Sequence, residues 1–377
     1  MFEKVNPGHP DKMADRLAGA VVDLVYERAG GLTKANPRVA CEVMAGHGRV
    51  DVQIETSLGR MDLRADDIDP LIRRLFGERV EGNVLIAPQD AHLSENQTRG
   101  LRCGDNGIFR GCPPTHEQKL LTAIAASIYE RWPYDGKYIV NAKLDEDLAK
   151  INREHYEGML TICQSHATND DIQEALMIFN DLNGEDIFGC PEDIARERVK
   201  RAWDRNHIMT EHRWISAEYK DGIDINHFHT AIWDGSEGFE KEVLKDSRSY
   251  ELATIINPLG PWTGGIDVDC GCTNRKLGSD MGDGVTGGGL MGKDLSKADV
   301  SVNIVCYLKA VASGQTVTAM CSIGDESVTF VYHDGHRETE TFADIVEMAR
   351  LYIITDCGGS FERFAEWGLI RPRIYKD

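Results

Sequence analysis

Apolar residues recur along the chain with periods that predict alternating helices and strands. From Pro10 to Arg28 they keep a helical spacing, with proline in the first turn and Gly30-Gly31 after the last. Residues 38–44 and 50–57 alternate apolar with polar positions on either side of Gly46-His47-Gly48, which predicts a β-hairpin. The predicted apolar face of this hairpin comprises Val39, Cys41, Val43, Val50, Val52 and Ile54.

The remaining elements follow no regular strand–helix–strand rhythm. The pattern predicts helices at Asp67–Phe76, Glu117–Arg131, Asp170–Leu182, Pro191–Asn206, Ser296–Ala312 and Phe342–Ile353. It predicts strands at Tyr138–Leu144, Asp224–Trp233, Thr316–Ser322 and Ser327–His333, and it assigns residues 256–292, rich in glycine and aspartate, to loops. This order favours an α+β fold, with α/β layers in several modules, over a Rossmann sheet.

Composition narrows the class of protein. With 377 residues, 41% of them hydrophobic and 28% charged, the chain is long enough for two or three globular modules. The sequence shows neither an apolar run of the roughly 18–20 residues that span a bilayer nor the pattern of a signal peptide. Its ten cysteines form no C-x-x-C pair, which predicts reduced thiols in the cytoplasm. A net charge of −20 argues against nucleic acid or an anionic membrane as the partner.

The first segment that could carry chemistry is Gly8-His9-Pro10-Asp11-Lys12, a loop that opens the first predicted helix. Free backbone N–H groups and the helix dipole favour an anion at such a position. Histidine, lysine and aspartate within one turn could hold a phosphate together with a divalent metal. An ordinary helix start, with proline and an acidic residue in the first turn, explains the same residues.

The second segment is the glycine-rich stretch GSDMGDGVTGGGLMG, from Gly278 to Gly292. Seven glycines in fifteen residues let the backbone approach a ligand closely and turn several N–H groups toward it. Residues 287–293 fit the start of a P-loop, but Asp294 stands where a P-loop needs Ser or Thr, and no apolar strand precedes the loop. A flexible surface loop is the other interpretation of such a stretch.

Cations gather around the glycine-rich stretch. Arg275 and Lys276 precede it, and Lys293 and Lys297 lie with Asp299 at the head of the helix that follows. Cations at a helix N-terminus oppose the helix dipole, so the helix itself gains nothing from them. A bound polyanion explains their position better than a solvated helix face does.

Together these segments resemble the methionine adenosyltransferase (S-adenosylmethionine synthetase) family, whose motifs they match in family order across most of the chain. Residues 8–12, GHPDK, and 38–42, RVACE, match family motifs, and GDNG at 104–107 is similar to G-D-Q-G. YDGK at 134–137 resembles P-D-x-K, and NPLG at 257–260 resembles N-P-T-G. DCGCTNRK at 269–276 resembles D-x-G-L-T-G-R-K, and residues 287–299 resemble G-G-G-A-F-S-G-K-D-P-x-K-V-D.

The resemblance implies three modules with approximate internal threefold symmetry. We expect an N-terminal module at residues 1–100, a central module at 101–254 and a C-terminal module at 255–377. It implies that ATP, L-methionine and water are converted to S-adenosylmethionine, phosphate and pyrophosphate, with Mg²⁺ and K⁺ as cofactors. It also implies a homodimer, or a dimer of dimers, whose active sites lie between subunits.

Matched motif positions assign the site residues that the resemblance implies. The catalytic residues would be His9, Lys137, Arg275, Lys276 and Lys293. ATP would contact these five residues and also Asp135, Pro261, Trp262 and Asp269, with Trp262 standing where the family usually has Phe. Methionine would be bound by Gln53, Glu55, Asp105, Asp269 and Lys297. Asp11 and Asp299 would bind Mg²⁺, and Glu42 would serve the K⁺ site.

Three departures from the family pattern qualify these assignments. The methionine-binding Glu of G-E-I-T-T-S falls on Gln53, and Glu55 on the same strand face could supply the missing charge. The stretch between Asn96-Gln97 and Gly104 is shorter than the usual gating loop, and the usual terminal T-A-A-Y-G-H-F-G is absent. One alternative is a non-catalytic regulatory relative, which would be expected to lose the phosphate-site charges. The other is an ATP-dependent phosphotransferase that uses the glycine-rich stretch and releases ADP.

Overall fold

The computed structural model describes residues 1–59, 61–92, 100–141, 156–183, 212–221, 224–233, 249–286 and 288–372, so the helix predicted at Pro191–Asn206 lies outside the described residues. The chain divides into two compact units. Unit 1 comprises Met1–Asn6, Thr115–Gly264 and Pro372–Asp377, and unit 2 comprises Pro7–Pro114 and Gly265–Arg371. The α+β fold class is confirmed, whereas the three modules and their threefold symmetry stay predictions.

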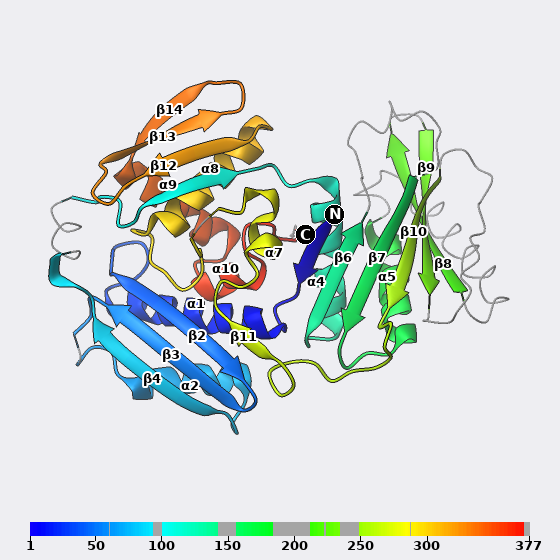
Figure 1. Cartoon of the computed structure of the whole chain (residues 1–377), viewed down its shortest axis with the longest axis horizontal. Helices are drawn as coiled ribbons and strands as arrows, with labels where there is room; N and C mark the ends of the chain where they lie inside the picture. Colours follow the sequence, from blue (N-terminus) through cyan, green and yellow to red (C-terminus); the bar gives the residue numbers. More distant parts are fainter. Residues whose placement is uncertain are drawn as a thin grey trace. The chain divides into compact units, whose positions relative to one another are not determined.

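Unit 1 is built on a six-stranded mixed sheet with the order β1-β6-β7-β10-β9-β8 (Figure 1). Its strands are β1 (Phe2–Val5), β6 (Gly136–Asn141), β7 (Tyr156–Gln164), β8 (His212–Asp221), β9 (Asp224–Trp233) and β10 (Ser249–Ile256). Strand β10 runs parallel to both β7 and β9, and the other neighbours are antiparallel. Helices α4 (His116–Arg131) and α5 (Asn169–Asn183) pack against the sheet. Strands β6 and β9 and both helices were predicted from the sequence.

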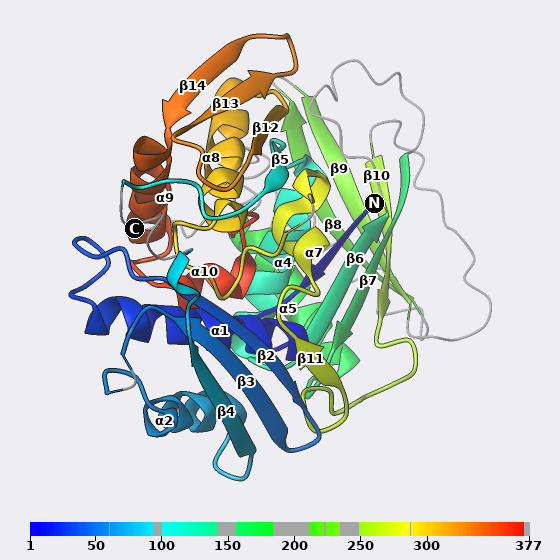
Figure 2. The same cartoon turned by 60° about the vertical axis from the view of Figure 1, so that its left-hand side comes forward.

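Unit 2 contains two four-stranded sheets, of which the first has the order β11-β2-β3-β4 (Figure 2). Strands β2 (Val39–Gly46) and β3 (Arg49–Thr56) form the predicted hairpin, and its predicted apolar face is buried. After helix α2 (Ala65–Phe76), strand β4 (Glu81–Pro88) runs parallel to β3. The short strand β11 (Cys270–Cys272) adds to the free edge of β2, and helix α1 (Pro10–Arg28) packs against both.

The second sheet of unit 2 has the order β14-β13-β12-β5. It consists of β5 (Gly107–Gly111), β12 (Val317–Cys321), β13 (Ser327–Tyr332) and β14 (Arg337–Thr341). Helix α8 (Ala298–Ser313) packs against β5 and β12, and α9 (Phe342–Asp356) packs against α8 and β14. The last helix, α10 (Phe361–Trp367), packs against α1, so the ends of unit 2 are joined through its helices.

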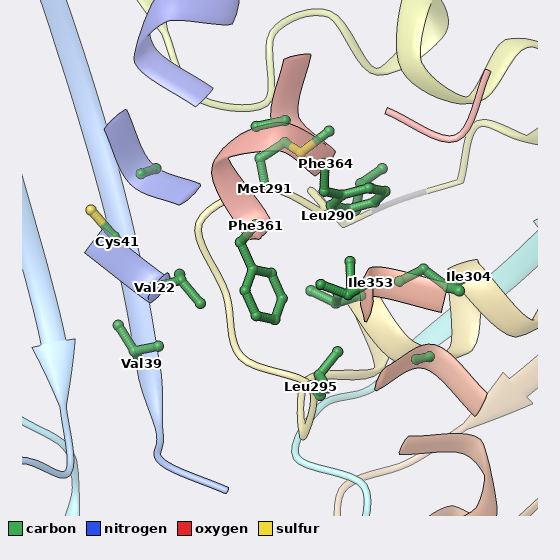
Figure 3. Close-up of a cluster of buried hydrophobic side chains, with 14 of the residues drawn as sticks. Val22, Val39, Cys41, Leu290, Met291, Leu295, Ile304, Ile353, Phe361 and Phe364 are labelled. Atoms are coloured by element: carbon green, nitrogen blue, oxygen red, sulfur yellow. The ribbon is translucent and has the colours of Figure 1, made fainter. Parts of the chain in front are cut away.

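The glycine-rich stretch is anchored in the core of unit 2. Leu290 and Met291 are each only 1% exposed and point into a cluster with Phe364 of α10 (Figure 3). Within the segment that the sequence assigned to loops, the structure also forms β11, the short helix α7 (Leu277–Met281) and a turn of 3₁₀ helix at Gly282–Gly284. Leu290 and Met291, at the end of the stretch, are therefore part of the core and do not lie in an exposed surface loop. No helix in the part of the chain that the structure describes is long and apolar enough to cross a membrane.

Candidate active site

The amino end of α1 brings three of the predicted site residues together. His9 is the N-cap residue, and its Nδ1 atom accepts a hydrogen bond from the backbone N–H of Asp11 at 3.1 Å. The Asp11 side chain is 3% exposed, and its Oδ1 atom accepts from the N–H of Cys272 at 2.9 Å. The Nε atom of Arg275 lies 3.5 Å from the same oxygen. His9, Asp11 and Arg275 therefore form one cluster.

The segment 269–276 lies beside this cluster because its backbone closely approaches the first turn of α1. A Cβ atom at Gly271 would overlap the carbonyl of Pro10, so only glycine lets β11 lie against the first turn of α1. Asp269 precedes β11, and its Oδ1 atom accepts from the N–H of Cys270 at 2.7 Å. Lys276 follows at the start of α7, where its carbonyl accepts from the N–H of Asp280 at 3.0 Å. The predicted residues Asp269 and Lys276 thus flank the cluster.

A second cluster lies at the head of α8. The Nζ atom of Lys293 is 2.7 Å from Oδ2 of Asp299, and both side chains are largely buried. Burial raises the pKa of Asp299 and the nearby Asp105 raises it further, although Lys293 lowers it. Lys297 is the N-cap residue of α8. Four predicted residues, Asp105, Lys293, Lys297 and Asp299, are therefore brought together here.

Lys293, which directly follows the glycine-rich stretch, lies at the edge of strand β2. The N–H of Cys41 donates to the carbonyl of Gly292 at 2.7 Å, and the N–H of Asp294 donates to the carbonyl of Val39 at 3.1 Å. Between them Lys293 forms an antiparallel bridge with Ala40. Because the backbone on both sides of Lys293 is hydrogen-bonded to a strand, the position of its side chain is defined by the sheet.

The residues assigned to methionine and K⁺ on the hairpin share one exposed face. Glu42 of β2 lies directly opposite Gln53 of β3, and Ala40 lies opposite Glu55. Gln53 and Glu55 are exposed while the residues between and beside them are buried, so the predicted common face is confirmed. The hydroxyl of Thr273 donates to Oε2 of Glu42, which ties this face to the 269–276 segment.

Unit 1 holds the remaining predicted residues. The carbonyl of Asp135 accepts from the N–H and the hydroxyl of Ser165 at 2.9 and 3.0 Å. A Cβ atom at Gly264 would lie 2.7 Å from the ring of Trp262 and 3.0 Å from Cβ of Asp135, so these two residues are neighbours. Pro261 precedes Trp262, and Lys137 is the second residue of β6. The roles of all these residues stay predictions.

Unit 2 also holds a buried charged cluster that the sequence did not predict, in which Lys12 follows Asp11 on α1. The Nζ atom of Lys12 lies 2.7 Å from Oδ1 of Asp280 and 3.1 Å from Oδ2 of Asp15, and all three side chains are fully buried. Burial lowers the pKa of Lys12, but its two carboxylate partners outweigh burial and raise it. Burial raises the pKa of Asp15 to about 7, because one ammonium cannot balance two buried carboxylates. The spacing of Lys12 and Asp15 on one helix face was the available signal.

This cluster predicts that Asp15→Asn raises the stability of the protein at pH 8, with a gain that shrinks toward pH 5. The pKa of Asp15 is about 7 in the folded chain against 3.8 for the ordinary carboxyl, so its contribution to stability is present below about pH 4 and is lost as the pH rises through about 7. Asparagine mimics the protonated form and has no proton to lose. Thermal unfolding between pH 5 and 8 measures the difference, and a gain independent of pH would contradict the raised pKa.

Known proteins of similar sequence were found for this chain. No protein-family model matches it. It is 25% identical over 381 residues to the S-adenosylmethionine synthase of Jannaschia sp., covering 92% of this chain and 83% of that protein. It is 26% identical over 380 residues to the S-adenosylmethionine synthase of Ruegeria pomeroyi, with the same coverage. The chain is a divergent relative of the S-adenosylmethionine synthases.

A solved structure shows that the fold agrees with this relationship. An unusual S-adenosylmethionine synthetase from Campylobacter jejuni superposes with a TM-score of 0.53 over 99% of this chain and 91% of that one. At 17% identity this likeness establishes the S-adenosylmethionine synthetase fold alone. The resemblance to this family that the ordered motifs indicated is therefore confirmed, and so is the fold.

Proposed function

We propose that the protein is a methionine adenosyltransferase, which converts ATP, L-methionine and water to S-adenosylmethionine, phosphate and pyrophosphate. The observation that carries the proposal is the gathering of His9, Asp11 and Arg275 at the amino end of α1, next to a segment that also bears Lys276. The relatives named S-adenosylmethionine synthase support it. An amino end of a helix and flanking cations together suit a polyanion such as triphosphate.

The reaction explains why the site needs cations rather than a base. The sulfur of methionine attacks C5′ of ATP, an S–C bond forms, and the C5′–O bond breaks with its electrons passing to the triphosphate. Because a thioether sulfur carries no proton, no general base is required. The barrier lies in the charge that develops on the leaving triphosphate, and preorganised donors aimed at this charge lower it. His9, Arg275, Lys276 and Lys293 of unit 2 would supply these donors, and the family resemblance assigns the same role to Lys137.

The neighbours of His9 fix how it would donate. Its Nδ1 atom accepts from the N–H of Asp11, so this geometry places the ring proton on Nε2. Nε2 is then the atom that would donate to a phosphate oxygen. The Arg275 side chain is 57% exposed and accessible to a ligand, whereas the Lys293 side chain is 17% exposed and largely buried, and it would meet the ligand with the exposed part. In unit 1, Trp262, preceded by Pro261, would stack on adenine beside Asp135.

The residues present fit the expected metals. Among the described residues no group of three or more His, Cys, Asp or Glu side chains is assembled to hold a metal. Mg²⁺ commonly binds through one or two carboxylates together with substrate phosphates and water. Asp11 and Asp299 would be these carboxylates, and Mg²⁺ would neutralise charge on the triphosphate. Glu42, which is exposed and accepts from Thr273, would serve K⁺.

Methionine would bind on the exposed face of the hairpin, with Asp105, Asp269 and Lys297 nearby. We expect Glu55→Gln to raise the KM for methionine by about tenfold, with little change for ATP, because a charged hydrogen bond contributes about 1.5–3 kcal/mol. Gln53 and Glu55 share the exposed face of β3, so either could receive the ammonium group. Steady-state kinetics of Glu55→Gln and Gln53→Glu distinguish them. An unchanged KM in Glu55→Gln with a lower KM in Gln53→Glu would assign the ammonium to position 53.

Product analysis tests the proposed function. The purified protein would be incubated with ATP, L-methionine, Mg²⁺ and K⁺, and nucleosides and phosphates would be separated and quantified. We expect methionine-dependent formation of S-adenosylmethionine with equal amounts of phosphate and pyrophosphate. ADP as the main nucleotide product would instead indicate a phosphotransferase, and no product with intact binding of ATP would indicate a non-catalytic relative. We further propose that the protein is cytoplasmic and forms a homodimer or a dimer of dimers with active sites between subunits. Analytical ultracentrifugation would test the oligomeric state.

A further inference from the structure

Asn274 joins three segments of the candidate site in unit 2. It precedes Arg275 and has a φ of +62°, in the left-handed region that asparagine tolerates better than most residues. Its backbone N–H donates to Oδ1 of Asp15 at 2.8 Å, which ties it to α1. Its side-chain Oδ1 accepts from the N–H of Met291 at 2.9 Å, and its Nδ2 donates to the carbonyl of Met291 at 3.3 Å. One residue therefore contacts α1, the Arg275–Lys276 turn and the glycine-rich stretch.

The spacing along α1 explains how the turn is held. Asp11 and Asp15 stand one helical turn apart, about 6 Å at 1.5 Å per residue, on one face of the helix. They accept from the N–H groups of Cys272, the last residue of β11, and of Asn274, in the turn that follows. Two carboxylates on one face of α1 therefore hold the segment that carries Arg275 at two points.

The other side of Asn274 fixes the glycine-rich stretch. Its amide takes up both backbone hydrogen-bonding groups of Met291, as a neighbouring strand would. A Cβ atom at Gly289 would overlap the Asn274 side chain, so the two segments are in tight contact. The Met291 side chain is anchored in the core (Figure 3), and Lys293 follows two residues later.

Unit 1 contains the same arrangement of an asparagine side chain bonded to both backbone groups of one residue. Asn257 has a φ of +42°, its Oδ1 accepts from the N–H of Gln164 at 2.9 Å, and its Nδ2 donates to the carbonyl of Gln164 at 3.2 Å. It begins the loop that carries Pro261 and Trp262. In each unit, an asparagine with a positive φ thus lies in a loop that bears proposed ATP contacts. Its side-chain amide bonds to the backbone N–H and carbonyl of one residue in a neighbouring segment, and these two bonds hold the loop to that segment.

We infer that Asn274 is a positioning residue, which sets Arg275, Lys276 and Lys293 at the spacing that a triphosphate requires. The inference rests on the proposed function, because it takes triphosphate as the ligand of these cations. Asn274 acts through the backbone on either side of it: its N–H holds the turn, and its amide holds the stretch before Lys293. Glycine stands at this position in the motif D-x-G-L-T-G-R-K, so Asn274→Gly keeps the φ angle and removes only the side-chain hydrogen bonds.

Binding of inorganic tripolyphosphate tests the inference without turnover. Titration calorimetry in the presence of Mg²⁺ would compare the wild-type protein with Asn274→Gly. We expect the Kd to rise about tenfold, which corresponds to about 1.4 kcal/mol and to the loss of two neutral hydrogen bonds. The kcat/KM for ATP should fall by a similar factor, with the KM for methionine nearly unchanged. His47→Gly is the matched control, because it also adds glycine at a positive φ, +51°, but in the hairpin turn.

The outcomes separate the inference from the proposed function. If the wild-type protein binds neither tripolyphosphate nor ATP, the proposed function is wrong. If the wild-type protein binds tripolyphosphate and Asn274→Gly binds it equally tightly, the inference is overturned, even when the melting temperature falls. Asn274→Asp is the second variant, because it keeps the acceptor for the Met291 N–H and loses the donor to its carbonyl. Because the added carboxylate also repels the triphosphate, the Kd of this variant should exceed that of the wild-type protein, and a Kd equal to the wild-type value would also contradict the inference.

Discussion

Alanine in place of Lys293 should slow the formation of S-adenosylmethionine by roughly a hundredfold or more at saturating substrates, because one charge-stabilising contact contributes about 2.7–4 kcal/mol to the transition state. The Lys293 side chain is 17% exposed and its Nζ atom lies 2.7 Å from Oδ2 of Asp299, so it is held largely out of water where its charge acts strongly. Its backbone is fixed to β2 on both sides. We expect His9→Ala and Lys137→Ala to slow the reaction by a similar factor.

Lys309→Ala is the matched control for Lys293→Ala. Lys309 lies on α8 and is 14% exposed, close to the value for Lys293. Its Nζ atom binds Glu338 at 2.6 Å and Glu340 at 2.9 Å on strand β14, away from the proposed triphosphate contacts. Removing it therefore tests the loss of a largely buried lysine by itself. Rates near those of the Lys309→Ala control in all three site variants would contradict the assignment of the phosphate contacts.

Elements whose pattern is local were predicted well from the sequence. Helix α1 begins and ends at the predicted residues, because proline, the N-cap and the pair of glycines act within a few residues of each end. The β2–β3 hairpin was also predicted with its buried face, since strict alternation shows which side chains enter a core. The shared exposed face of Gln53 and Glu55 follows from the same alternation.

Elements whose partners lie far away in sequence could not be predicted in this way. Strand β11 has three residues, too few to show a period, and it exists because Gly271 permits contact with Pro10 of α1. Strand β5 pairs with β12, about 200 residues later in the chain. The buried cluster of Lys12, Asp15 and Asp280 joins residues 268 positions apart, and a lysine in the first turn of a helix normally indicates a solvated position. Only the tertiary structure shows that it is fully buried.

The candidate site was predicted residue by residue, but its order in space was not. Motif matches supplied Asp11, Arg275 and Lys293 separately, and none of them showed that the Asp11 carboxylate would accept from the backbone of the segment that carries Arg275. The residues that create this order, Gly271 and Asn274, bear no charge. Charged residue types therefore indicate the chemistry of a site. A glycine at a close backbone approach, such as Gly271, and an asparagine at a positive φ, such as Asn274, indicate its geometry.

Gly288→Ala should lower the rate of S-adenosylmethionine formation by about a hundredfold, the effect that a displacement of roughly 1 Å has on reacting groups. A Cβ atom at Gly288 would overlap the carboxylate of Asp299, so the added methyl group forces that side chain to move. Asp299 is the proposed Mg²⁺ ligand and the partner of Lys293, and its side chain is only 8% exposed, which leaves it little room. We also expect the Mg²⁺ concentration for half-maximal rate to rise.

Gly278→Ala is the control for this substitution. Gly278 belongs to the same glycine-rich stretch, lies in α7, and has no atom within 4 Å of the position of an added Cβ. Its replacement should leave the rate and the Mg²⁺ dependence unchanged. Gly288→Ala keeps every charged group of the site, whereas Lys293→Ala removes one. A large loss of rate with a changed Mg²⁺ dependence would therefore report the position of the Asp299 carboxylate, and a Mg²⁺ dependence like that of the wild-type protein would exclude Asp299 as the metal ligand.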